Sequence, residues 1–68
     1  MEPKQLEKIG KLLFGVRWKK PLADLIGVHR HTIEGLVDGS WKMSDEIEQR
    51  IRSAAAERIR QLQETLRK

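Results

Sequence analysis

Two histidines, His29 and His31, carry the only imidazole side chains of a chain that has no cysteine. Residues two apart on a helix point about 200° away from each other, so these histidines are not expected to share a metal ion. The acidic residues lie mostly on helix faces that we expect to be exposed. The sequence therefore predicts neither a catalytic Ser/His/Asp set nor a pair of catalytic carboxylates. We therefore predict no metal site, no cofactor and no enzymatic activity.

The charge balance indicates a polyanion as partner. Fourteen Lys and Arg against ten Asp and Glu give a net charge of +4, and the sequence pI is about 9.9. An excess of this size favours nucleic acid without identifying it. A chain of 68 residues buries only about 60% of its unfolded surface, which leaves too thin a core for a large cleft. We expect one domain and no small-molecule ligand.

The hydropathy pattern predicts neither a membrane span nor a signal segment. The longest apolar runs have three or four residues, as in Leu12-Leu13-Phe14, whereas a span needs about 20. The N-terminal residues alternate in charge and have no apolar signal core. We therefore expect a cytoplasmic protein that does not contact a membrane.

Apolar residues at helical spacing, each run followed by a glycine, predict three short helices. No stretch alternates between apolar and polar residues for long enough to predict a strand. The predicted helices cover residues 3–14, 19–26 and 29–38, and the glycines that end them are Gly15, Gly27 and Gly39.

A fourth and longer helix is predicted from Ser44, its N-cap, to Leu66. It contains no Gly or Pro, and its length of about 23 residues corresponds to about 34 Å. The remaining helices cannot cover so long an element. The fold is predicted to be all-α, a compact helix-turn-helix bundle of about four helices with an extended C-terminal helix. The i,i+4 ion pairs expected along this helix are Glu46–Arg50, Glu48–Arg52 and Glu64–Lys68.

The segment KKPLADLIGVHRHTIEGLVD, residues 19–38, has the apolar pattern of a helix-turn-helix. Ala23 is small enough for the second helix of the motif to cross close to it. Gly27 adopts the left-handed backbone conformation at low cost in the turn. Ile33 and Leu36 anchor the later helix in a shared core.

Residues 13–44 resemble the helix-turn-helix domains of the Cro and lambda-repressor-like (XRE) family of phages and bacteria. The resemblance covers about half of the chain. The residues that carry it are Gly15, Arg17, Trp18, Leu22, Ala23, Gly27, Val28, Thr32 and Gly39. The sequence departs from the family pattern at Leu36, where tryptophan is common, at Glu34 and Gly35, where basic residues are frequent, and at Ser44, where proline is frequent.

The resemblance implies that the later helix of the motif enters the major groove of double-stranded DNA. Arg30 would then bind guanine O6 and N7, Glu34 would accept from cytosine N4, and Gly35 would let the helix lie deeper in the groove. The base-contacting residues so implied are His29, Arg30, His31, Glu34 and Gly35. The phosphate-contacting residues so implied are Lys19, Lys20, Thr32, Ser40, Trp41 and Lys42.

Several of these residues have a structural alternative. His29 suits an N-cap as well as a base contact, and Arg30 has the alternative of a solvated surface position. Glu34 either reads a base or repels phosphate at wrong sites. Trp18 and Trp41 are expected to pack in the core and in the loop rather than to stack on bases.

A second apolar stripe on the C-terminal helix predicts a homodimer. Its members are spaced four, three and four residues apart, as in a coiled-coil seam. The alternative is that the stripe folds onto its own domain, but helices before it offer little surface to cover residues 55–66. We therefore divide the chain into a helix-turn-helix core, residues 1–43, and a core-packing and dimerising helix, residues 44–68. The stripe consists of Ala55, Ile59, Leu62 and Leu66.

These observations predict a sequence-specific DNA-binding transcriptional regulator. By resemblance it is a phage or bacterial repressor that binds a pseudo-palindromic operator as a dimer, with its own operon as one candidate target. Two alternatives stay open. One is a non-specific, architectural DNA-binding protein, and the other is a protein–protein adaptor that uses the helix-turn-helix as a scaffold.

Overall fold

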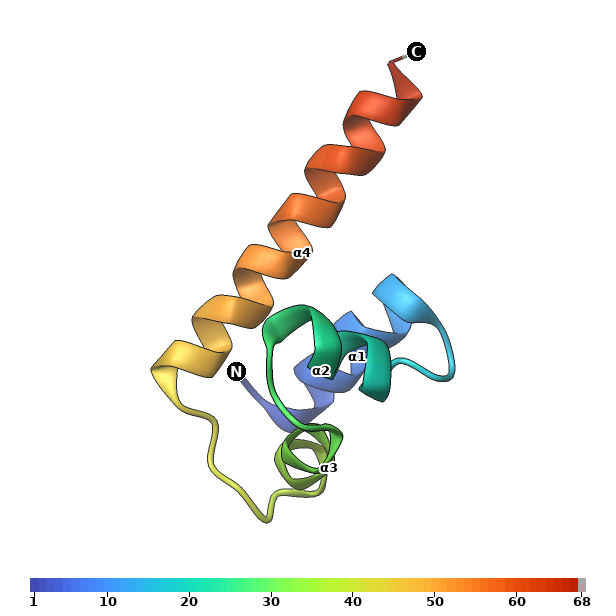
Figure 1. Cartoon of the computed structure of the whole chain (residues 1–68). Helices are drawn as coiled ribbons and strands as arrows, with labels where there is room; N and C mark the ends of the chain where they lie inside the picture. The colour runs from blue at the N-terminus through green and yellow to red at the C-terminus, as the bar shows by residue number, and fades with distance from the viewer. Residues whose placement is uncertain (68) are drawn as a thin grey trace.

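Four helices make up the computed structural model, which describes residues 1–67 (Figure 1). No strand occurs within this range, so the all-α prediction is confirmed. The third helix begins one residue later than expected because His29 caps it from outside. The helices are α1 (Pro3–Phe14), α2 (Lys19–Ile26), α3 (Arg30–Asp38) and α4 (Asp45–Leu66).

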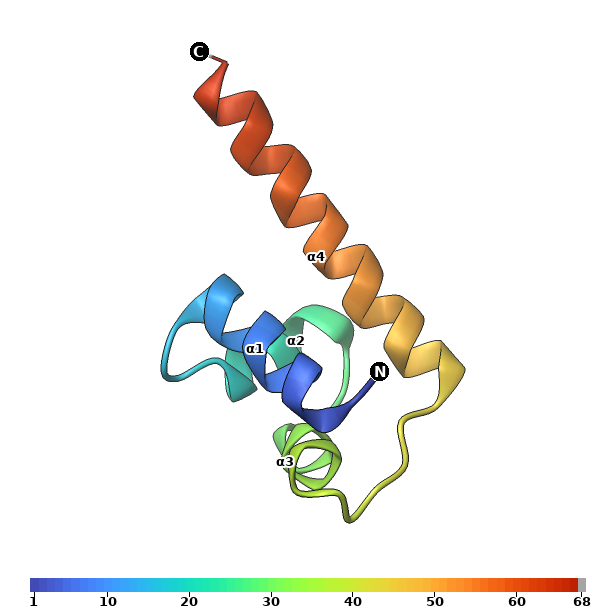
Figure 2. The ribbon, with the colours of Figure 1, turned by 180° about the vertical axis from the view of Figure 1, so that it is seen from behind.

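Helices α1, α2 and α3 form a cluster, and α4 crosses it and continues beyond it (Figures 1 and 2). The first part of α4 packs against α1 and α2. Its C-terminal turns point away from the cluster, which gives the molecule an elongated shape of 43 × 24 × 20 Å. The extended C-terminal helix predicted from the sequence is thereby confirmed.

The core is built on one fully buried aliphatic residue from each helix. Leu6, Leu22, Ile33 and Ile51 have no exposed surface. Trp18, at 2% exposure, joins them from the turn before α2. The core packing expected for Trp18 and for the C-terminal helix is therefore observed. The other buried core residues are Ala23, Ile26 and Leu36.

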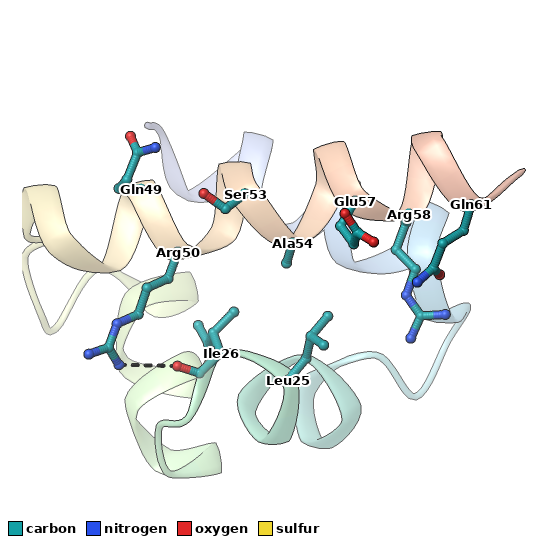
Figure 3. Close-up of a pocket in the computed structure, with 9 residues that line it drawn as sticks. All are labelled: Leu25, Ile26, Gln49, Arg50, Ser53, Ala54, Glu57, Arg58 and Gln61. Atoms are coloured by element: carbon teal, nitrogen blue, oxygen red, sulfur yellow. Dashed lines mark hydrogen bonds between the residues drawn. The ribbon is translucent and has the colours of Figure 1, made fainter. Parts of the chain in front are cut away.

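Capping interactions hold α4 at its N-terminus and against α2. The Ser44 hydroxyl accepts a hydrogen bond from the Ile47 amide at 3.2 Å, as predicted for an N-cap. The Arg50 guanidinium donates to the Ile26 carbonyl at 3.1 Å and so satisfies a carbonyl at the C-terminal end of α2 (Figure 3). This bond lies at one end of an open groove of about 580 Å³ between α2 and α4.

Two of the three expected ion pairs along α4 are present. Arg50 pairs with Glu46 at 2.7 Å and Arg52 pairs with Glu48 at 3.3 Å. Glu64 pairs with Arg60, one turn earlier, at 2.6 Å. Its expected partner, Lys68, lies outside the described residues.

Substituting Gly10 by Ala is expected to destabilise the protein by about 1–3 kcal/mol, the usual cost of overpacking a core. An added Cβ would lie 1.9 Å from Trp18 Cε3, and the indole is too tightly buried to move away. At an unpacked helical site the same change would stabilise the helix by about 1 kcal/mol. Urea unfolding followed by circular dichroism measures the difference.

Lys8→Ala is the matched control, because Lys8 is exposed on the same helix and its loss should change stability by less than about 0.5 kcal/mol. A Gly10→Ala variant as stable as the unsubstituted protein would contradict the packing of α1 on Trp18.

Candidate nucleic-acid interface

The motif predicted over residues 19–38 is present as α2, a three-residue turn and α3. Gly27 has the left-handed backbone conformation, with φ 77° and ψ 34°, and ends α2. The Val28 amide donates to the Ala23 carbonyl at 3.0 Å and closes the turn. Because α3 uses Ile33 and Leu36 to contact the core, its opposite side is turned to solvent.

His29 is the N-cap of α3. Its Nδ1 accepts a hydrogen bond from the His31 amide at 3.1 Å, which satisfies one of the free amides of the first turn. The capping alternative is therefore observed, and a base contact by the same ring stays a prediction.

The two histidine rings lie closer together than helical geometry predicts. Their centroids are 4.6 Å apart, because His29 has an extended backbone, with φ −76° and ψ 148°, and stands outside the helix. The expectation that His29 and His31 point in opposite directions is therefore wrong. No group of three or more potential metal ligands is found among residues 1–67.

Arg30 and Glu34 form an ion pair on the outer side of α3. The distance from Arg30 Nε to Glu34 Oε1 is 3.5 Å, and the side chains are 54% and 43% exposed. An exposed pair of this kind contributes little to stability, so exchanging it for a contact with a ligand costs little. This pairing of Glu34 with Arg30 was not predicted from the sequence.

Gly35 does not leave an open space on α3. The residue is buried, and a Cβ added to it would lie 3.0 Å from Cγ of Trp41. The Trp41 amide also donates to the Gly35 carbonyl at 3.1 Å. The prediction that Gly35 lets the helix lie deeper in a groove is therefore wrong, because the Trp41 ring covers this position.

The loop after α3 is folded by its own hydrogen bonds. The Ser40 amide donates to Asp38 Oδ1 at 2.8 Å. Ser40, through its side chain and its amide, lowers the pKa of the Asp38 carboxyl below its ordinary value. Ser40 is thus engaged with a carboxylate, and Lys42, which is exposed, is the residue of this loop best suited to phosphate.

The N-terminal ends of α2 and α3 lie on the same side of the motif. A shallow groove of about 260 Å³ is lined by Lys20 and Asp24 of α2, by Val28 and His29 of the turn and by Arg30. No side-chain hydrogen bond caps the start of α2, so its first amides are available to an anion. Lys19 and Thr32 are half-buried and Lys20 is exposed. The structure thus brings Lys20 and Arg30 together at one surface.

The apolar stripe of α4 is largely uncovered. Ile59, Leu62 and Leu66 are 56%, 63% and 84% exposed, whereas Ala55 is half-buried. Leu12 of α1, at 77% exposure, lies at the same shallow groove as Leu62. Most of the stripe therefore does not fold onto its own domain.

No protein-family model, no curated protein and no solved structure matches this chain. Among residues 1–67, no helix has the length and apolar character needed to cross a membrane.

Removing the His29 side chain is expected to destabilise α3. His29→Ala should lower the free energy of unfolding by about 1 kcal/mol, the usual cost of losing an N-cap, whereas His29→Asn retains a capping oxygen and should restore most of that loss. Urea unfolding of the two variants beside the unsubstituted protein measures both values. Equal stability of the Ala and Asn variants would show that the bond to the His31 amide contributes nothing.

Proposed function

We propose that this chain is a sequence-specific DNA-binding protein that places α3 in the major groove of a duplex. The observation that carries the proposal is the exposed outer side of α3, where Arg30 projects beside Lys20 and the start of α2. Arg30 matches the acceptor pair of guanine, and the amides of α2 with Lys20 and Lys42 match the phosphates on either side. This division of roles is the one used by helix-turn-helix proteins.

The biological role that we propose is transcriptional repression in a bacterial or phage-infected cell. The support is the resemblance of residues 13–44 to the Cro and lambda-repressor-like family. Bound to a promoter, the helix-turn-helix would act by excluding other proteins from the DNA that it covers. Its own operon is one candidate target, and the host cytoplasm is the place where such a repressor would act.

A two-fold dimer completes the proposal. The exposed stripe formed by Ile59, Leu62 and Leu66 is the surface that a second copy would cover. Two such heptads are too few to associate alone, so the globular part must contribute, and Leu12 of α1 lines the same shallow groove as Leu62. A two-fold pair would present two α3 helices about 34 Å apart, the spacing of successive major grooves on one side of the duplex.

Arg30→Ala should cost about 1–3 kcal/mol of binding to the preferred site and relax the preference at one base pair. Lys42→Ala should instead weaken binding to preferred and random duplexes alike and reduce the dependence of affinity on salt. The preferred site comes from selection of bound duplexes from random DNA, and titrations at several salt concentrations give the affinities.

Equal losses on preferred and random DNA for Arg30→Ala would contradict the role given to Arg30. Random duplex bound within about tenfold of the selected site would favour the architectural alternative, because specific readers discriminate by about a thousandfold or more. Absence of any retained duplex at low ionic strength would leave the adaptor alternative.

Leu62→Glu should convert a dimer into a monomer, since it places a charge in the middle of the exposed stripe. Gln63→Glu is the control, because it adds the same charge on the same helix outside the stripe and should leave the dimer intact. Sedimentation at tens of micromolar protein, with and without DNA, measures the state of each variant. A monomer in both conditions for the unsubstituted protein would remove the dimer from the proposal.

A further inference from the structure

Gly35 is buried although it points in a different direction from Ile33. It is two residues beyond Ile33, which is fully buried, and therefore lies about 200° around α3 from it. Its neighbours on the outer side are Glu34, the residue before it, and His31, one turn earlier, and both are at least partly exposed. The residue that covers Gly35 is Trp41, from the loop after α3.

The Trp41 ring occupies the volume in which a side chain at residue 35 would begin. A Cβ added to Gly35 would lie 3.0, 3.1 and 3.3 Å from Cγ, Cδ1 and Cδ2 of that ring. The bond from the Trp41 amide to the Gly35 carbonyl, 3.1 Å long, fixes the loop in this position. Residue 35 has no side chain beyond a hydrogen atom, so the indole of Trp41 forms the surface of α3 at this position.

The exposure of this indole separates it from the other tryptophan of the chain. Trp41 is 56% exposed, whereas Trp18 is 2% exposed and belongs to the core. Part of the Trp41 ring packs against Gly35, and a large apolar surface of the ring stays in contact with water. Desolvation of that surface is favourable when an apolar group of a ligand meets it.

We infer that Trp41 is a specificity-determining residue, whose indole contacts the C5 methyl group of a thymine when α3 lies in the major groove. This inference rests on the proposed function. The thymine methyl is the apolar group that base pairs display in the major groove, and an indole ring offers it a matching surface. The phosphate role expected for Trp41 from the sequence is therefore replaced, and Lys42 keeps that role in the loop.

The test uses the full chain and the duplex selected from random DNA, in which each thymine is replaced in turn by uracil. Uracil keeps every hydrogen-bonding group and lacks only the methyl. One replacement should weaken binding of the unsubstituted protein by about three- to fivefold, the worth of one buried methyl group. Trp41→Ala should bind the thymine and uracil duplexes equally at that position.

Lys42→Ala is the matched control, because it should weaken binding to both duplexes while keeping the preference for thymine. Trp41→Phe retains an aromatic ring at the same place and should keep part of the preference, which guards against a merely misfolded loop. Quenching by acrylamide gives an independent readout, since Trp18 is buried and the accessible fluorescence comes from Trp41. The quenching of Trp41 fluorescence by acrylamide should decrease when the selected duplex is added.

A selected duplex that is bound with no methyl-sensitive position would overturn this inference and leave the proposed function standing. The same holds if the Trp41→Ala variant retains the full preference for thymine, or if acrylamide reaches Trp41 equally in the complex. Failure to bind any duplex at low ionic strength would overturn both.

Discussion

The contact among Leu6, Leu22, Ile33 and Ile51 is the interaction on which the rest of the structure depends. Each helix contributes one completely buried aliphatic side chain. A chain of this size is too small for a second hydrophobic core that would add to its stability. Because Ile33 and Leu36 of α3 pack in this core, the direction in which the polar side of α3 faces is fixed. The same packing that makes the domain stable therefore orients the Arg30 surface.

The charge of the protein is distributed in a way that suits this orientation. Residues 1–44 contain eight Lys and Arg against five Asp and Glu, whereas α4 contains four Arg against five Asp and Glu. Most of the charges of α4 neutralise one another in pairs one turn apart. The positive excess of residues 1–66 therefore belongs to the helix-turn-helix core, where Lys20, Arg30 and Lys42 lie.

The elements of the fold could be predicted from sequence because their signals are local. Glycines with positive φ end α2 and α3, Ser44 caps α4, and the apolar spacing of each helix identifies its buried side. The details of the candidate site depend on groups that meet only after folding. The Trp41 ring reaches Gly35 across the loop, and this contact does not follow from helical periodicity. The bond from the His31 amide to the His29 ring, by contrast, is local and is one of the two roles expected for His29. The only sequence signal for the contact between Trp41 and Gly35 is their spacing, with a tryptophan six residues after a glycine and just beyond Gly39, which ends α3.

The two halves of α4 have different surroundings, since Ile51 of the first half is buried in the core whereas Leu62 and Leu66 of the second half are exposed. Ile51 anchors the helix in the core, and the bond from Arg50 to the Ile26 carbonyl ties it to the end of α2. The direction of α4 is thereby set relative to the helix-turn-helix, so the exposed residues Leu62 and Leu66 project at a fixed position. A second copy bound along that stripe would consequently hold its α3 at a distance determined by the core, because α4 runs without interruption from Ile51 in the core to Leu66 in the stripe.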